Sequence, residues 1–431
     1  MFSRMEGEHS HELSTRKTAR HLINVAVKKK AVRETSLRPN KLIDNELRAQ
    51  PNQLSVLTAR DIAYVRHNAY NARRALGPKL PTSLEESINQ LSAYQAKTSK
   101  DENFILHVAI ERKSVVFSCP TNMEVLRQSE VIYVDSTFEY CPKHFKQMFT
   151  LHVLLQEQYI PVVFALLPDK AEASYKAVFQ LLASDYNIQP HTVVADFEAA
   201  IHNAVIAVWP HAVITGCRFH LLQARFRNVQ QFGLSKDYID ETEVGKWIRY
   251  TFGLPFLAPT EVMNCYLEDL FPILIASTHL DEHKSLEKYR NYLLNNYLAD
   301  DSRFPSHLWA DQTAAMGKTT NACESFHADF NASFYSSHPD LYTFIDTLLM
   351  FQNKTYIKIN SLGTGDVFPP IRREVRERHA YLQKKLMSTI VELFHDSSTF
   401  ELWATTTRTL WQRKKAPFKI MSERRALKQA M

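Results

Sequence analysis

The stretch "VIYVDSTFEY", residues 131–140, places an aspartate inside a run that otherwise reads as a buried strand. Residues 131–134 are apolar and mostly β-branched or aromatic, which is typical of strands. Asp135 follows them directly, although a carboxylate is a poor strand former and is almost never fully buried without a partner. We therefore ask whether Asp135 has a chemical role.

The sequence around this strand predicts a mixed sheet. Four further strands are predicted at residues 145–155, 159–169, 192–196 and 211–216. Residues 156–158 form the predicted turn between the second and third strands. Pro161 indicates that the third strand lies at an edge or has its free N–H side outward. Three consecutive strands followed by alternating helices and strands predict an α/β fold with helices on the sheet faces.

Changes of pattern along the chain divide it into six predicted segments. They are a basic arm at 1–41, a helical region at 42–120, a sheet-bearing core at 121–235, a helical segment at 236–316, a returning helix at 317–360, and a linker with a basic helical tail at 361–431.

The composition limits the possible classes of protein. With 431 residues, 45% hydrophobic and 23% charged, the chain is globular and long enough for two or three units. Its net charge of +6 suggests a polyanionic partner. The sequence has no run of 18 apolar residues, so we expect no membrane span. The N-terminus lacks the apolar core of a secretory signal. The five scattered cysteines favour a reducing compartment, and nine glycines without a glycine-loop motif argue against nucleotide binding.

Asp135 and Asp196 occupy equivalent positions, because each ends a short apolar strand. Ligands of open sheets bind beyond the carboxyl ends of strands. Two carboxylates on neighbouring strands would repel each other, and a hard divalent cation would relieve that repulsion. A third carboxylate would allow two metals to bind about 4 Å apart and clamp a phosphodiester. The alternative for each aspartate is a strand-end cap or turn residue.

Four segments, in order, resemble the Mutator-like element (MULE) transposases. They are "DSTFEYCPKHFKQMFTLHV", "VVADFEAAIHNAV", "GCRFHLLQARFR" and "TTNACESFHADFNASF", and the resemblance covers about residues 120–355. It implies a ribonuclease H-like mixed sheet flanked by helices, with helical terminal regions. It also implies a DDE triad of Asp135, Asp196 and Glu324, and it identifies 236–316 as a helical insertion between the second and third acidic residues.

The resemblance also implies an activity and partners. The triad would bind two Mg²⁺ or Mn²⁺ ions and catalyse cleavage at transposon ends, after which the freed 3′ hydroxyl attacks target DNA. Related transposases commonly act as dimers, and the basic runs at 28–30 and 413–415 suggest a nuclear location. Two alternatives to a transposase stay open. One is a domesticated protein that binds DNA or chromatin without catalysing a reaction. The other is a metal-dependent nuclease on the same fold.

Cys217 and His220 form a C-x-x-H motif at a predicted helix start. Similar transposases have this motif after the second aspartate, so the resemblance implies that it shapes the active site or the DNA path. A zinc site needs four ligands, and Cys323 and His327 are conceivable partners that nothing in the sequence demands. A packed cysteine and a hydrogen-bonded histidine are the alternative, and we do not expect zinc.

Other residues are candidates for DNA contact or for a lost zinc finger. The candidates for DNA contact are Lys28, Lys29, Lys30, Arg225, Arg227 and Trp309. The lysines and arginines would bind phosphate, and Trp309 would stack on a base. The alternatives are a solvated arm for the lysines, a solvated helix face for the arginines and core packing for Trp309. "GEHSHE", within residues 6–12, resembles the end of a FLYWCH-type zinc finger. Because no cysteine pair precedes it, we expect a remnant of that finger.

Overall fold

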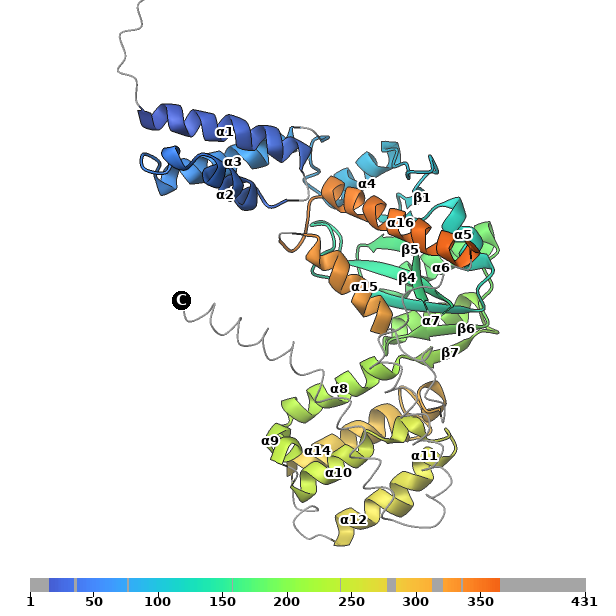
Figure 1. Ribbon diagram of the computed structural model, residues 1–431. Helices are drawn as coiled ribbons and strands as arrows, with labels where there is room; N and C mark the ends of the chain where they lie inside the picture. The colour runs from blue at the N-terminus through green and yellow to red at the C-terminus, as the bar shows by residue number, and fades with distance from the viewer. Residues whose placement is uncertain are drawn as a thin grey trace, which may run out of the picture.

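The computed structural model describes residues 15–34, 37–75, 77–156, 158–240, 242–276, 284–311, 321–334 and 336–364. A seven-stranded sheet forms its centre, with helices on both faces (Figure 1). The strands are β1 (Ile105–Ala109), β2 (Ser114–Phe117), β3 (Val131–Thr137), β4 (Gln147–Leu155), β5 (Gln158–Leu167), β6 (Thr192–Ala195) and β7 (Val213–Gly216).

The principal helices follow the same chain order. They are α1 (Thr15–Arg33), α2 (Pro39–Ala49), α3 (Ala59–Arg74), α4 (Leu84–Ala93), α5 (Pro120–Arg127), α6 (Glu172–Tyr186), α7 (Ala199–Val208), α8 (Arg218–Gln231), α9 (Ser235–Asp240), α10 (Glu243–Thr251), α11 (Glu261–Asn264), α12 (Phe271–Ala276), α14 (Lys284–Leu293), α15 (Asn321–Ala332) and α16 (Leu341–Thr364). None of the described helices is long and apolar enough to cross a bilayer.

The sheet has the order β1-β2-β5-β4-β3-β6-β7. Strands β1 to β5 pair antiparallel with their neighbours, whereas β3, β6 and β7 run parallel. This mixed sheet with helices on both sides is consistent with a ribonuclease H-like fold, so the predicted fold class is confirmed. All five predicted strands are present.

Two strands were not predicted. Residues 105–109 and 114–117 form β1 and β2 within the region expected to be helical, and β2 extends the sheet by pairing with β5. Lys113, in the turn between them, has a φ of 52°. The short β-branched runs on either side of this turn carry the strand signal.

Of the two alternatives predicted for Pro161, the edge strand is wrong, because β5 lies between β2 and β4. Pairing with β2 is confined to residues 164–166, so it does not extend to Pro161. On the β4 side, His152 pairs with Pro161 and Leu151 with Val163, which leaves Val162 as an extra residue. A bulge is one of the few places in a sheet interior that tolerates proline.

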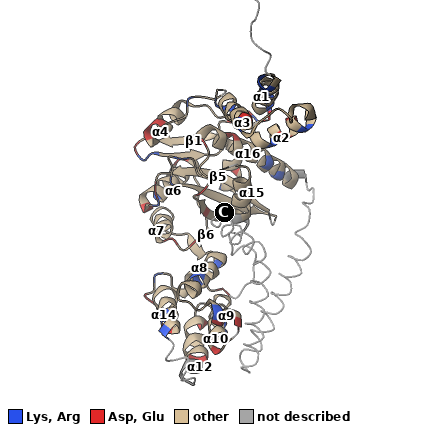
Figure 2. Cartoon of the chain, turned by 90° about the vertical axis from the view of Figure 1, so that its left-hand side faces the viewer, with Lys and Arg blue, Asp and Glu red and all other residues tan. Residues whose placement is uncertain are grey.

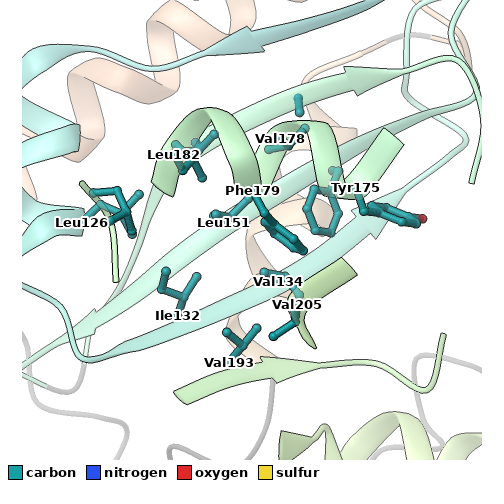
Figure 3. Packing of buried hydrophobic residues seen from close by; sticks show 14 of the residues in the cluster. Leu126, Ile132, Val134, Leu151, Tyr175, Val178, Phe179, Leu182, Val193 and Val205 are labelled. Carbon is teal, nitrogen blue, oxygen red and sulfur yellow. The ribbon is translucent and has the colours of Figure 1, made fainter. Parts of the chain in front are cut away.

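Two apolar cores cover the two faces of the sheet. On one face, α5, α6 and α7 pack on β3 through residues such as Ile132, Val134 and Phe179 (Figure 3). On the other face, α4, α15 and α16 pack on β2 and β5 through residues such as Phe164 and Phe330. Because side chains alternate along a strand, Tyr133 and Asp135 face the α15 side.

The helices from α8 to α14 have a core of their own, which includes Trp247, Tyr289 and Trp309. They lie beyond the β7 edge of the sheet (Figure 1). The predicted insertion began at residue 236, but Leu221 and Phe226 of α8 already belong to this core. The chain therefore enters the insertion through α8 itself.

The N-terminal arm predicted for residues 1–41 is replaced, from residue 15, by α1 packed against α2 and α3. The predicted boundary at 41 lies inside α2. Ala19, Ile23, Val27 and Ala31 recur every four residues and form the buried face of α1. Residues 1–14, with the finger-like "GEHSHE", lie outside the described residues.

The predicted linker at the start of 361–431 is partly helical, since α16 continues to Thr364. The rest of that segment, including its basic tail, lies outside the described residues.

Candidate active site

The pairing of β3 with β6 brings Asp135 and Asp196 together. In these parallel strands Tyr133 pairs with Val194; Asp135 lies two residues further along β3, and Asp196 directly follows the end of β6. The charge of Asp135 raises the pKa of Asp196, so the two carboxylates lie close together. Val193 and Ala195 face the α7 core, while Val194 packs with Tyr133 on the other side of the sheet. By this alternation both aspartates belong to the face that α15 covers.

Asp135 is a buried carboxylate with two partners. Its Oδ2 lies 3.2 Å from Nδ1 of His327, and its Oδ1 accepts a hydrogen bond of 2.8 Å from the N–H of Ser136. Burial raises the pKa of Asp135, but the hydrogen bond and charge of His327, the charge of His220 and the Ser136 N–H outweigh it. The pKa therefore lies below its ordinary value, and Asp135 is ionised at neutral pH.

His327 links Asp135 to a buried polar chain on β4. Its Nε2 lies 3.0 Å from Oγ1 of Thr150, which pairs with Asp135 across the sheet. Nε2 of His152 lies 3.1 Å from the same hydroxyl. Burial, followed by the charge of His327, lowers the pKa of His152 to about 3, so this imidazole is neutral. These hydrogen-bonded side chains hold His327 in one orientation, and His327 in turn orients Asp135.

Asp196 has a different environment, although it follows the neighbouring strand. Its Oδ1 is buried and has no hydrogen-bond partner among the described residues. Burial raises the pKa of Asp196 to about 6; the charges of Glu198 and Asp135 act in the same direction, while those of His220 and Lys170 oppose them. An unpartnered carboxylate oxygen is costly, and a cation would relieve that cost.

His220 lies close enough to the two aspartates for its charge to lower the pKa of both. Cys217 is the N-terminal flanking residue of α8, and its N–H donates to the carbonyl of Ala195 at 2.6 Å. The C-x-x-H motif thus joins the end of β7 to the acidic pair, at the position where the resemblance predicts a site-shaping role.

Glu324 lies on α15, one helical turn before His327 and next to Cys323. Cys323 packs against Tyr133 of β3 and Val194 of β6. The backbone of α15 therefore passes over the two strands that carry the aspartates. The side chain of Glu324 is outside the described part of the structure, so its role as the third acidic residue stays a prediction.

The side chains around the two aspartates fit a metal ion only in part. Among them, no three His, Cys, Asp or Glu side chains gather into a metal-binding group. The two aspartates nevertheless offer hard oxygen donors, of which one is buried without a partner. These donors suit Mg²⁺ or Mn²⁺, and a third carboxylate would have to come from a residue such as Glu324.

The structure corrects two predicted DNA contacts. Arg225 is completely buried in the insertion core, where its guanidinium lies over the rings of Tyr297 and Trp309 and donates to the Thr251 carbonyl. Trp309 is also buried, and its indole N–H donates to the carbonyl of Phe304. Neither side chain is available to DNA, because both pack inside the insertion.

The remaining predicted contacts lie where DNA could reach them. Arg227, two residues after Arg225, is exposed on α8. Lys28 and Lys29 are exposed on α1, whereas Lys30 is half-buried and pairs with Glu46. Their contact with DNA stays a prediction.

Sequence reasoning missed Glu198 and underrated His327. Glu198 follows Asp196 by two residues and is held by Lys170 and by the hydroxyl of Tyr175. The acidic spacing in "ADFEA" was the available signal. His327 was considered only as a conceivable zinc ligand, since its contact with Asp135 joins residues far apart in the sequence.

Residues 131–224, from β3 into α8, match the MULE transposase domain. A search of curated proteins found no match. The matched segment contains Asp135, Asp196, Cys217 and His220, and it supports a transposase-related function and an interaction with DNA.

Proposed function

We propose that the chain is a DDE-type transposase, or a protein derived from one, that cleaves and joins DNA with Mg²⁺ or Mn²⁺. The observation that carries the proposal is the acidic pair: Asp135 on β3 and Asp196 directly after the parallel neighbour β6 interact electrostatically, and Asp196 has a buried, unpartnered oxygen. The match to the MULE transposase domain supports DNA as the substrate of this pair.

In the proposed mechanism, Asp135 and Asp196 would hold the metal ions, and Glu324 would supply the third carboxylate. The bound cations would stabilise negative charge on the reacting phosphodiester oxygens. His327 fixes Oδ2 of Asp135, so the orientation of this carboxylate is set before DNA binds. The charge of His220 favours the ionised form of both aspartates.

Cleavage of supercoiled plasmid in Mn²⁺ tests this function. We expect the full chain to nick the plasmid, and Asp135→Asn, Asp196→Asn and Glu324→Gln to abolish nicking. Asp185→Asn is the matched control, because Asp185 is an exposed carboxylate on α6. Equal nicking by all variants would refute the assignment of the site. A wild-type chain that binds DNA but never nicks it would favour the domesticated, non-catalytic alternative.

A further inference from the structure

Helices α1, α2 and α3 form a unit in which positive charge is concentrated. Residues 15–75 contain fourteen Lys and Arg but only four Asp and Glu, a net charge of +10, whereas the whole chain has +6. Two of the four carboxylates are already paired, Asp61 with Arg16 and Arg20, and Glu46 with Lys30. Such an excess destabilises a small unit through self-repulsion unless a polyanion binds it.

Helices α1 and α3 lie side by side and run in the same direction. Arg16 Nε lies 2.8 Å from Asp61, the Arg20 guanidinium lies 4.8 Å from the Tyr64 ring centroid, and Asn68 Nδ2 donates to Asn24 at 2.9 Å. The residue numbers of the contacting pairs increase together along both helices, so the helices are parallel. Exposed side chains that border this seam therefore form one continuous surface.

One stripe of α3 has side chains suited to DNA. Arg60, Tyr64, His67, Asn71 and Arg74 recur at helical spacing, and all five are exposed. We call them the α3 stripe. The only acidic residue of α3 is Asp61, which is buried at the α1 contact and paired with Arg16 and Arg20.

The chemistry of the α3 stripe favours duplex DNA over other polyanions. Arginine binds phosphate or guanine, and asparagine binds adenine in the major groove of B-DNA, which admits an α-helix. Double-stranded RNA closes that groove to side chains. An anionic membrane would require a broad apolar face, which the polar stripe does not provide. The stripe spans about 21 Å of helix, so it is long enough to follow the groove.

We propose that the α3 stripe binds duplex DNA in the major groove, with Arg60 and Arg74 at its ends on phosphates and Lys28 of α1 beside it. This surface is separate from the acidic pair, because α3 lies in a unit with its own core. It would anchor DNA independently of the catalytic residues. The inference deepens the proposed function by assigning a surface to DNA recognition.

Fluorescence anisotropy with a labelled mixed-sequence duplex and no added metal tests the proposal. The Arg60→Gln/Arg74→Gln double variant of the full chain should bind at least about tenfold more weakly, and the slope of log affinity against log salt should decrease by about 2. The matched control is Lys41→Gln/Arg48→Gln, which removes two exposed cations from α2 of the same unit. We expect the control to bind nearly as tightly as the wild type.

Three outcomes would overturn the proposal. They are equal losses in the two double variants, no loss in the α3 variant, and binding to phosphatidylserine vesicles that the α3 variant abolishes while duplex binding persists. Thermal unfolding of both double variants checks that they fold. The His67→Ala/Asn71→Ala variant tests the same stripe without a change of formal charge. Duplex binding is measured without metal, whereas nicking is measured with Mn²⁺, so failure here and failure of the catalytic proposal are distinguishable.

Discussion

At the scale of single residues, the two aspartates occupy matched positions but have opposite pKa shifts. Asp135, held by His327, has a pKa below its ordinary value, while Asp196, buried with an unpartnered oxygen, has a pKa raised to about 6. A pair of titratable groups whose pKa values are pushed apart is typical of a functional site. Asp135 is thus held by a hydrogen-bonding partner, whereas Oδ1 of Asp196 is buried without one.

The raised pKa of Asp196 predicts how stability depends on pH. Its folded-state pKa of about 6 exceeds the ordinary value of 3.8, so the fold favours the protonated form. The stabilising effect is complete below about pH 4 and is lost as the pH rises through about 6. In the absence of metal, the wild type should therefore lose up to about 3 kcal/mol relative to Asp196→Asn between these limits. Urea unfolding across this range measures the difference, and parallel profiles would contradict the prediction.

The contact between His327 and Asp135 predicts different effects of two substitutions. The amide nitrogen of an asparagine can replace Nδ1 and still donate to Asp135, whereas that of a glutamine replaces Nε2 and reaches Thr150. We expect His327→Asn to retain Mn²⁺ binding and His327→Gln to weaken it by about tenfold. Calorimetry with matched thermal unfolding separates this effect from a loss of fold. The opposite order of the two variants would show that the Asp135 contact does not position the site.

At the scale of helices and strands, the parallel register of β3 and β6 explains why two distant aspartates meet. The sequence predicted both strands, but it placed Asp135 at a strand end, whereas β3 continues to Thr137, and it could not predict the order of the strands in the sheet. Pro161 shows the limit of such reasoning, because the bulge that accommodates it depends on the partner strand. The strands β1 and β2 were overlooked because they are short and lie between helical segments.

The close packing around Gly216, at the end of β7, predicts that a larger residue there lowers stability. A Cβ atom added there would lie 2.5 Å from Cζ of Phe197, the residue after Asp196. Phe197 in turn packs against Tyr297 and Phe304 of the insertion. Gly216→Ala should therefore cost about 1–3 kcal/mol of stability. Gly77→Ala is the control, since nothing lies within 4 Å of its added Cβ. Equal unfolding midpoints for the two variants would argue against this close contact.

Two arginines of α8 lie two residues apart, and we expect their substitutions to have different effects on stability. Arg225 is buried against Tyr297 and Trp309, so Arg225→Ala should lose about 2–4 kcal/mol of stability. Arg227 is exposed, and Arg227→Ala should unfold like the wild type. Denaturant unfolding measures both effects. Comparable losses would mean that α8 does not pack on the insertion core as described.

At the scale of the whole molecule, the ribonuclease H-like sheet lies between a basic helical unit and a helical insertion (Figure 2). The sequence predicted the sheet, the insertion and an excess of basic residues near the N-terminus. It misread residues 15–41 as an arm, because the charge pattern hid the four-residue spacing of the small apolar residues that α1 buries. It could not place the basic unit beside the core, since packing between units leaves little trace in local pattern.

Calorimetric titration of the full chain with Mn²⁺ tests the central claim most directly, because it asks whether the acidic pair binds a metal. The wild type and Asp185→Asn should bind the ion, and Asp196→Asn should not. Because protons compete for Asp196, wild-type affinity should also fall as the pH decreases through about 6. Binding by Asp196→Asn that equals the wild type would contradict the account.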